Sequence, residues 1–305
     1  MSAPRTAASL PWMPAVFVVI WSTGFIVARY GMPHAPPMGF LAWRFALSVL
    51  LFAAWVGWSR AAWPQDRRQL LHLAVLGLLI QAGYLGGVWS AVKLGLGAGT
   101  TALIVGLQPV LTALWVARAS RTPQPVAPLQ WLGLALGFGG LLLVVGDKLG
   151  AGEITPANLA LCVLALLAIT AGTLYQKRFV GPCDVRIANL VQLAAAFAVT
   201  LPLALLETEP VRLVPELAGA MLWSVFGLTL GGSSLLYLLI RRGAATHVAS
   251  LMYLVPPCTA LMAWLMFGEP LSPAMLAGLG ATAVGVALVV RAPLPQAAAQ
   301  RIGGR

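Results

Sequence analysis

The segment Leu107-Gln-Pro-Val-Leu-Thr-Ala-Leu114 is repeated 147 positions later as Leu254-Val-Pro-Pro-Cys-Thr-Ala-Leu261, and five of the eight residues are identical. Beyond this segment, two prolines and two glycines recur at a spacing of 145, namely Pro125 with Pro270, Pro128 with Pro273, Gly133 with Gly278 and Gly140 with Gly285. A repeat of this length indicates that the chain consists of two related structural units. We place these units at residues 1–150 and 151–305.

The composition of the chain is that of a protein whose surface faces lipid. Of its 305 residues, 60% are hydrophobic and 9% are charged, and the mean hydropathy is +0.88. Soluble domains carry about 25% charged residues, so secretion as a folded domain and disorder are excluded. The net charge of +11 reflects 8 acids against 19 bases with no long basic run, which excludes nucleic acid as a partner. The three cysteines show no pairing or metal-binding pattern, so no disulfide and no metal site are expected.

Apolar runs of about twenty residues, separated by short breaks rich in Pro, Gly or charge, predict ten membrane-spanning helices. The expected spans are 12–29, 37–58, 70–92, 100–117, 128–146, 157–176, 186–206, 217–240, 247–267 and 273–291. Each half then holds five spans, and because five is odd the second half must cross the bilayer in the opposite orientation. The expected fold is an all-α polytopic membrane protein with ten transmembrane helices in two inverted five-helix repeats, an architecture typical of secondary transporters that work by alternating access.

The distribution of basic residues predicts the orientation of these spans. Fourteen bases fall on one side of the expected topology: Arg5, Arg60, Arg67, Arg68, Arg118, Arg121, Lys177, Arg178, Arg186, Arg241, Arg242, Arg291, Arg301 and Arg305. Four fall on the other: Arg29, Lys93, Lys148 and Arg212. Since loops rich in Lys and Arg stay in the cytoplasm, we expect both termini there, with the chain in a bacterial-type inner (plasma) membrane.

Several motifs occur in a defined order along both halves. They are Trp21-Ser-Thr-Gly24 in span one, Arg44 in span two, the Pro109 and Pro256 segments, and Gly268-Glu-Pro270 before a Gly-rich last span. With the duplication, these residues resemble the drug/metabolite transporter superfamily, specifically its EamA-type two-repeat exporters, over residues 12–291. The chain departs from the family pattern at Arg121-Thr-Pro-Gln-Pro125, where the family often has a Glu-Pro element, so a role for Glu269 is not mirrored in the first half.

The resemblance implies export of small metabolites such as amino acids, including aromatic ones, with neither ATP nor a prosthetic group. Two other interpretations stay open: a carrier or exchanger of nucleotide-like or sugar solutes, working in either direction, and a membrane scaffold or sensor without flux. An enzyme is not expected, because the sequence has no GxSxG, HExxH or P-loop motif and no intramembrane cluster of His, Asp and Glu.

No acidic residue falls in the middle of an expected span. The eight acids are Asp66, Asp147, Glu153, Asp184, Glu207, Glu209, Glu216 and Glu269, all in linkers or at span ends. Intramembrane carboxylates are the usual proton relays and sodium ligands of pumps, so we expect a facilitator or a substrate exchanger. His247, at the expected start of span nine, is the one titratable alternative.

Arg44 is the one charge well inside an expected span, and its repeat partner at an offset of 148 is Gln192. A lone arginine in a membrane faces protein or water. Two interpretations of Arg44 stay open. As a structural residue it would cap backbone carbonyls or extend to the membrane interface. As a functional residue it would form part of a gate or contact a substrate carboxylate.

Polar and aromatic residues at helical spacing predict a substrate cavity formed mainly by spans one, three and four with their counterparts six, eight and nine. The candidate substrate-binding residues are Trp21, Ser22, Thr23, Arg44, Gln81, Tyr84, Trp89, Thr101, Gln108, Thr112, Tyr175, Ser233 and Tyr237; Val88 and Thr229 continue two of these stripes. The alternative for each Ser or Thr is a hydrogen bond to a neighbouring helix. Four tryptophans would either line such a cavity or simply pack against lipid: Trp21, Trp89, Trp115 and Trp223. A cavity with these aromatic walls would suit an aromatic or branched amino acid.

Pro109 and Pro256 are candidate hinges, because proline removes a backbone donor within a span; the alternative is a static kink. Small residues form close-packing faces in the last span of each half, Gly133 and Gly137 in one and Ala277, Ala281 and Gly285 in the other. These faces pack either between the halves or in a homodimer.

Overall fold

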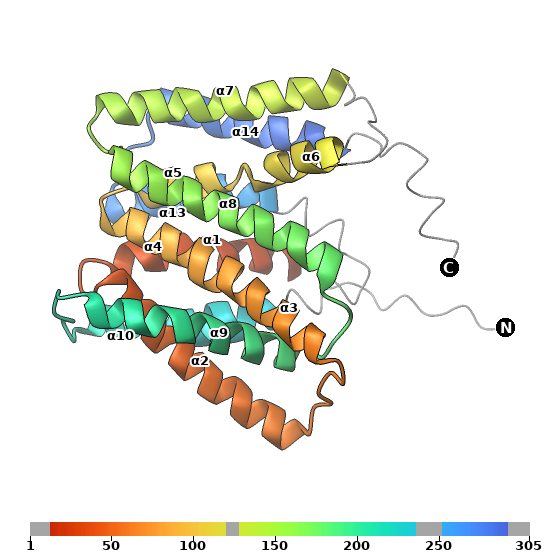
Figure 1. Ribbon diagram of the computed structural model, residues 1–305. Coiled ribbons are helices and arrows are strands. Elements are labelled where there is room, and N and C mark those ends of the chain that lie inside the picture. Colours follow the sequence, from red (N-terminus) through yellow and green to blue (C-terminus); the bar gives the residue numbers. More distant parts are fainter. Residues whose placement is uncertain (1–12, 120–127, 236–251, 292–305) are drawn as a thin grey trace.

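The computed structural model describes residues 13–119, 128–235 and 252–291, and within these ranges the chain is helical without a strand (Figure 1). The elements of the first half are α1 (Met13–Gly31), α2 (Pro37–Ser59), α3 (Arg67–Gly77), η1 (Leu78–Leu85), α4 (Gly86–Lys93), α5 (Ala98–Val105), α6 (Gln108–Ala119) and α7 (Pro128–Gly150). Those of the second half are α8 (Pro156–Phe179), α9 (Val185–Leu206), α10 (Pro215–Leu222), η2 (Trp223–Gly232), η3 (Met252–Leu254), α13 (Val255–Phe267) and α14 (Pro273–Arg291).

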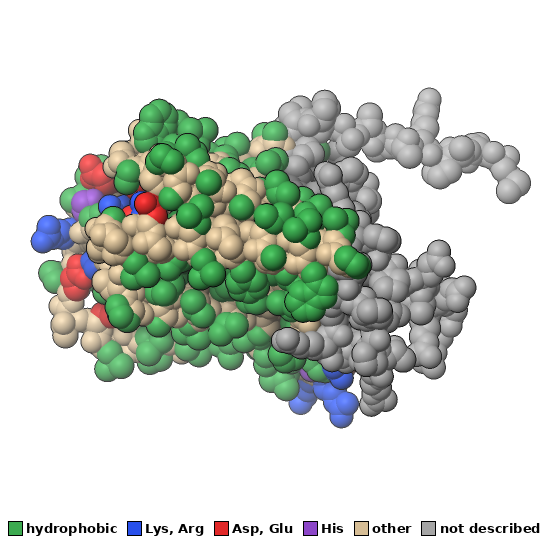
Figure 2. Space-filling model, turned by 90° about the horizontal axis from the view of Figure 1, so that it is seen from above, with side chains coloured by type: hydrophobic (Ala, Val, Ile, Leu, Met, Phe, Trp, Pro, Cys, Tyr) green, Lys and Arg blue, Asp and Glu red, His purple; other side chains and the backbone are tan. Residues whose placement is uncertain are grey.

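These elements form ten apolar helical spans within the described residues. Seven are long enough to cross a bilayer on their own, and three shorter apolar helices, Ala15–Gly31, Met252–Phe267 and Pro273–Leu288, complete the set. The all-α polytopic fold expected from the sequence is confirmed, with span ends displaced by a few residues. Figure 2 shows a broad apolar surface across the middle of one face and charged side chains toward the ends.

The starts of the spans follow from local sequence. Proline occupies the first turn of α2, α8 and α10, where its missing N–H has no helical partner to lose. Thr155 and Asn158 form a capping box at the start of α8. Asp66 caps α3, and Asp184 caps α9 and binds Arg186 through its carboxylate. Five spans therefore begin at a proline or a capping side chain that suits a helix start.

Contacts between spans follow the twofold relation of the halves. The second span of one half packs on the second of the other (α2 with α9), and the fifth on the fifth (α7 with α14), at opposite edges of the bundle (Figure 1). The contact of α1 with α13 has its counterpart in the contacts of α8 with α5 and α6. Since α1 ends and α8 begins at the same end of the bundle, the two halves run in opposite directions.

The small-residue faces of α7 and α14 pack against each other. A Cβ built at Gly285 would lie 2.5 Å from the carbonyl oxygen of Gly133, and one at Gly140 would lie 2.6 Å from that of Gly278. Helix backbones approach this closely only where side chains are absent. These glycines therefore join the two halves within one chain, and a homodimer stays a prediction.

One end of the bundle carries most of the acids. It comprises the five loops between α1 and α2, α4 and α5, α7 and α8, α9 and α10, and α13 and α14, with the adjacent helix ends, and we call it the acidic end. All eight acids lie within the described ranges, six of them here: Asp147, Glu153, Glu207, Glu209, Glu216 and Glu269. Asp66 and Asp184 lie at the opposite end, so no carboxylate lies in the middle of a span.

Three spans are not the uniform α-helices that the sequence suggested. The fourth, expected as one helix over 100–117, is broken between α5 and α6 at Gly106 and Leu107. The third and eighth contain the π-helical segments η1 and η2. The expected spans 217–240 and 247–267 extend into residues 236–251, which lie outside the described residues, as does His247.

Candidate functional site

A cavity of about 120 Å³ lies between the first and second halves of the bundle. One water molecule needs roughly 10–15 Å³ when volume is measured in this way. The cavity therefore has room for several water molecules or for one small organic solute. Its walls come from α1, α2, η1 and α4 of the first half and η2 of the second, with Ser233. The lining residues are Trp21, Gly24, Phe25, Arg44, Ile80, Gln81, Tyr84, Leu85, Val88, Trp89, Leu228, Thr229 and Ser233.

The two π-helical segments face this cavity from equivalent spans. η1 supplies Ile80, Gln81, Tyr84 and Leu85, and η2 supplies Leu228 and Thr229. In η2, the hydroxyl of Thr229 donates to the carbonyl oxygen of Ser224, five residues earlier, at 2.9 Å. Single-turn π-helical distortions are frequent at functional sites because they redirect side chains and carbonyls. The widened turns thus bring polar groups of both halves to one space.

Arg44 projects from α2 into the cavity and is 6% exposed. Its Nη2 donates to Oγ1 of Thr229 at 3.2 Å, and its Nε has no hydrogen-bond partner among the described residues. It forms no ion pair there, because every acid of the chain lies at a span end. The Thr229 hydroxyl already donates to Ser224, so it presents only its oxygen to the guanidinium. Arg44 is therefore a buried cation that lines the cavity, with one neutral hydrogen-bond partner in the described structure and an unpaired Nε.

Aromatic rings form the apolar part of the wall. Trp89 is 1% exposed and stacks on Phe40, with ring centroids 4.5 Å apart. Trp21 packs against Phe17 at 5.4 Å. The rings of Phe40 and Phe17 thus hold the two indoles in place, since aromatic pairs at this distance are favourable. The cavity thus combines one cation, a few hydroxyl and amide groups, and fixed aromatic faces.

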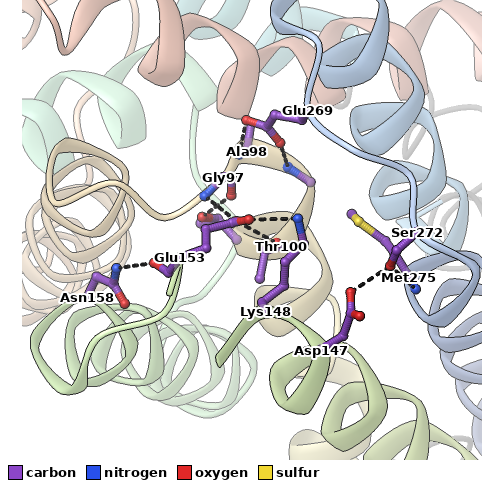
Figure 3. A network of polar contacts seen from close by, with 12 residues as sticks. Gly97, Ala98, Thr100, Asp147, Lys148, Glu153, Asn158, Glu269, Ser272 and Met275 are labelled. Carbon is purple, nitrogen blue, oxygen red and sulfur yellow. Dashed lines mark hydrogen bonds and ion pairs between the residues drawn. The ribbon is translucent and has the colours of Figure 1, made fainter. Parts of the chain in front are cut away.

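At the acidic end, Glu269 connects the second half to the first (Figure 3). Gly268 ends α13 in a left-handed conformation (φ 67°), which only glycine adopts freely, and turns the chain toward α5. The Glu269 carboxylate then accepts from the backbone N–H of Ala98 at 2.9 Å and of Gly99 at 3.3 Å, at the start of α5. It also pairs with Arg29 at 3.7 Å. An anion in this position is stabilised by the helix dipole and the free N–H groups.

Glu153, in the loop between the halves, binds the same helix start from the other side (Figure 3). Its carboxylate accepts from the N–H of Gly97 at 3.0 Å and the hydroxyl of Thr100 at 3.2 Å, and pairs with Lys148 at 2.7 Å. A Cβ at Gly97 would lie 2.7 Å from one Glu153 oxygen, so glycine leaves room for the carboxylates.

A second set of bonds joins the halves at the start of α2. The Glu207 carboxylate accepts from the N–H groups of Met38 at 3.0 Å and Gly39 at 2.7 Å. Glu209 pairs with Lys93 at 2.5 Å. Both acids belong to the second half and their partners to the first, so carboxylates of one half hold the other at this end.

The family model for the EamA-like transporter family matches this chain twice, over residues 12–146 and 157–291. The chain belongs to the EamA-like transporter family. Its two matches contain five spans each, in agreement with the duplication and with the drug/metabolite transporter resemblance.

Relatives of this EamA-like chain are named as transporters. It is 25% identical over 285 residues to the inner membrane transporter YedA of Escherichia coli (strain K12), covering 92% of this chain and 90% of YedA. It is 25% identical over 278 residues to a probable amino-acid metabolite efflux pump of Salmonella typhimurium, covering 88% and 90%. A crystal structure with 17% identity superposes with a TM-score of 0.60 over 91% of this chain and 95% of that one, which shows the same fold. The protein is accordingly a multi-pass inner membrane transporter.

Six of the thirteen candidate binding residues of the EamA-like chain line the cavity. They are Trp21, Arg44, Gln81, Tyr84, Trp89 and Ser233. They comprise the lone intramembrane charge and polar or aromatic residues at helical spacing. The structure thus brings residues of spans one, two, three and eight together around one volume. Arg44 caps no carbonyl in the described structure.

The other candidates that the structure describes lie outside the cavity. Ser22 donates to the carbonyl oxygen of Val255 at 3.4 Å, so it joins α1 to α13. Thr23 accepts from the indole N–H of the half-exposed Trp223. Tyr175 pairs with Nδ1 of His72 at 2.7 Å. Tyr237 lies outside the described residues.

The candidates of span four also make helix contacts. Thr101 is buried and donates to the carbonyl oxygen of Gly97, and Thr112 donates to that of Gln108. The Gln108 amide donates to the hydroxyl of Thr173 at 2.9 Å, between α6 and α8. Trp115 is 64% exposed. Among the described residues, spans four, six and nine, which were expected to form the cavity, contribute no lining residue, whereas span two contributes Arg44.

Seven lining residues were not among the candidates: Gly24, Phe25, Ile80, Leu85, Val88, Leu228 and Thr229. Val88 and Thr229 continue the predicted stripes, so helical spacing contained the signal for them. The other five are apolar or glycine, and in a chain that is 60% hydrophobic nothing in the sequence separates a cavity-lining leucine from a lipid-facing one.

Both candidate hinge prolines begin a helical segment. Pro109 is the second residue of α6, directly after the break at Gly106 and Leu107, and Pro256 is the second residue of α13, after η3. Proline at a helix start loses no helical hydrogen bond. In the first half the chain thus breaks just before Pro109, whereas in the second the 3-10 turn η3 leads directly into α13 just before Pro256. Their action as hinges stays a prediction.

Proposed function

We propose that this protein exports small amphipathic metabolites that carry a carboxylate, amino acids with aromatic or branched side chains among them, by alternating access. The observation that carries the proposal is Arg44, a buried cation with an unpaired Nε and no carboxylate partner, which lines a cavity between the halves. A buried charge without a counter-ion is costly. A substrate carboxylate supplies that counter-ion, and guanidinium is well matched to it in geometry.

The remaining lining groups suit the rest of such a molecule. The substrate body would pack on Trp21 and Trp89, whose faces are rigid and apolar. Gln81, Thr229 and Ser233 offer amide and hydroxyl groups for its polar atoms. A mostly apolar pocket with a few convergent polar groups is the usual form of a small-molecule site. The name of the Salmonella relative, a probable amino-acid metabolite efflux pump, supports the same class.

Alternation of access would come from movement of one half against the other. At the acidic end, Glu269, Glu207 and Glu209 hold groups of the opposite half, so opening there requires those bonds to break. The helix break before Pro109 and the 3-10 turn before Pro256 lie at equivalent places in the repeat, where each half would bend. With both termini in the cytoplasm, as the basic loops predict, the acidic end faces outward.

The energy for export would come from the substrate gradient. No carboxylate lies in the cavity or at the middle of a span, and intramembrane carboxylates are the usual carriers of coupling ions. The protein would accordingly work as a facilitator or an exchanger without a cofactor.

The test is counterflow in proteoliposomes. Vesicles loaded with unlabelled phenylalanine and leucine should take up the labelled amino acids without an imposed pH or sodium gradient. Gln81→Ala, which removes a lining amide, should slow uptake, whereas Lys177→Gln, at the exposed end of α8, should not. No uptake of any amino acid or related carboxylate, or uptake of nucleotide or sugar probes instead, would refute the proposal.

A further inference from the structure

We infer that the preferred substrate crosses as a net monoanion, a carboxylate with an apolar or aromatic body and no ammonium group, and that the membrane potential drives its export. This inference rests on the proposed function, because it concerns the same cavity. It narrows the substrate class and gives the transport a direction.

The charge of the cavity carries the first step. Arg44 is the single ionised side chain among its lining residues, and it is 94% buried by its 6% exposure. Its hydrogen-bond partner, Thr229, is neutral, and its Nε is unpaired in the described structure. All eight acids of the chain lie within the described ranges, and none of them lines the cavity. The site is thus complementary to one negative charge.

An amino-acid zwitterion fits this site less well than a simple carboxylate. When its carboxylate binds Arg44, its ammonium group must lie a few ångströms from the same guanidinium. Like charges at such a distance repel, and more strongly in a dry enclosure than in water. The cavity offers this ammonium only neutral oxygens, such as those of Gln81 and Thr229, and the faces of Trp21 and Trp89. A carboxylate without the ammonium group avoids this cost.

The direction of transport follows from the charge that is moved. Without a carboxylate in the cavity to carry a compensating proton or sodium ion, the net charge transferred in each cycle is that of the substrate. Arg44 stays within the protein, whichever side the cavity faces. A membrane that is negative inside then drives a monoanion outward and leaves a zwitterion unaffected. Export of an anion therefore needs no ion coupling.

The experiment compares three probes that share one phenyl ring and differ in charge: phenylpyruvate as the anion, phenylalanine as the zwitterion and phenylalanine amide as the cation. The full-length protein is reconstituted in liposomes with a potassium gradient and valinomycin to set the potential. We expect phenylpyruvate to enter fastest. In vesicles held positive inside by a tenfold potassium gradient, it should accumulate about tenfold, because one charge moves with each molecule. Phenylalanine should only equilibrate.

Each other outcome contradicts part of the argument in a distinguishable way. If phenylalanine enters as fast as phenylpyruvate, or if phenylpyruvate uptake ignores the potential, the inference is overturned while the proposed function stands. Indifference to the potential would mean that a proton or a counter-substrate crosses with the anion. If no probe enters, both the proposed function and the inference are refuted.

Variants of Arg44 connect the preference to the residue. Arg44→Gln should lower the ratio of phenylpyruvate to phenylalanine uptake by about tenfold or more, because loss of a buried charge partner costs at least that much. Arg44→Lys keeps the charge and should keep the preference for the anion. Lys177→Gln removes an exposed cation and should change neither rate. An unchanged ratio in Arg44→Gln would overturn the inference, and if that variant does not fold, the response of the natural protein to the potential decides.

Discussion

Replacement of Glu269 by glutamine should make the acidic end of the bundle open more often. Glu269 belongs to the second half, and both of its oxygens accept backbone N–H groups at the start of α5 in the first half. Glutamine retains one acceptor oxygen and loses the negative charge. The loss of one hydrogen bond costs about 1 kcal/mol, and the loss of an anion at a helix start costs roughly 0.3–1 kcal/mol.

The sum is about 1–2 kcal/mol, which changes the ratio of open to closed molecules about 5- to 30-fold. The ion pair with Arg29 adds little, because that arginine is 40% exposed and 3.7 Å away. Glu153, in the loop between the halves, would still bind the start of α5, so the helix itself should remain intact.

The assay measures how fast a cavity residue becomes reachable from the acidic end. Val88, which is 2% exposed, is replaced by cysteine in a chain whose three native cysteines are substituted. A membrane-impermeant maleimide then labels Val88→Cys at a rate proportional to the open fraction, so Glu269→Gln should label about 5- to 30-fold faster. Glu216→Gln removes an exposed acid from the same end and is the matched control. Equal rates in Glu269→Gln and the parent, or the same acceleration in Glu216→Gln, would refute the reasoning.

Three further outcomes are expected. Gly285→Ala should lower the stability of the detergent-purified protein by about 1–3 kcal/mol, because its Cβ would overlap the facing helix. Gly280→Ala is the control and should not lower it, because the space around Gly280 is open. Equal melting temperatures of the two variants would contradict the close packing. The guanidinium of Arg186, hydrogen-bonded to Asp184, lowers the pKa of that carboxyl. The stability that this bond contributes is therefore present above the unfolded-state pKa of about 3.9 and is lost as the pH falls through the folded-state pKa. Asp184→Asn should melt at a lower temperature than the parent at pH 6 and at the same temperature at strongly acidic pH, and a difference that persists in acid would contradict this. Gln81→Ala should slow flux more than Gln108→Ala, because only the first lines the cavity, and the reverse order in a vesicle uptake assay would place the site elsewhere.

The number and order of the spans could be predicted because both depend on properties that extend over whole segments. Twenty apolar residues in a row have few alternatives to a membrane helix. The duplication fixed five spans per half, which in turn required opposite orientations. Local departures were not predictable in this way. The π-helical segments η1 and η2 depend on packing between helices, and their sequences are apolar like the rest of their spans.

The success and failure of the polar stripes have one physical explanation. Gln81, Tyr84 and Val88 lie within one uninterrupted helical span, and all three face the cavity. Thr101 and Gln108 are seven residues apart, which puts them on one face of a continuous helix, but the chain breaks between them at Gly106 and Leu107. Spacing arguments hold only while the helix is continuous, so the stripe of span four was divided between two different contacts.

The carboxylates of this protein lie at the ends of the bundle, whereas Arg44 lies in its middle, and this separation links the structure to the energetics of transport. The carboxylates of Glu269, Glu207 and Glu153 are bound to backbone N–H groups at helix starts, where they hold the bundle together at the acidic end. Acids used in this way are not available at the depth of the cavity to bind a coupling ion. Arg44 is left there without a carboxylate partner, and an anionic solute can take that place. With the carboxylates at the ends of the bundle, the energy of transport would therefore come from the concentration gradient of the solute and from the action of the membrane potential on its charge.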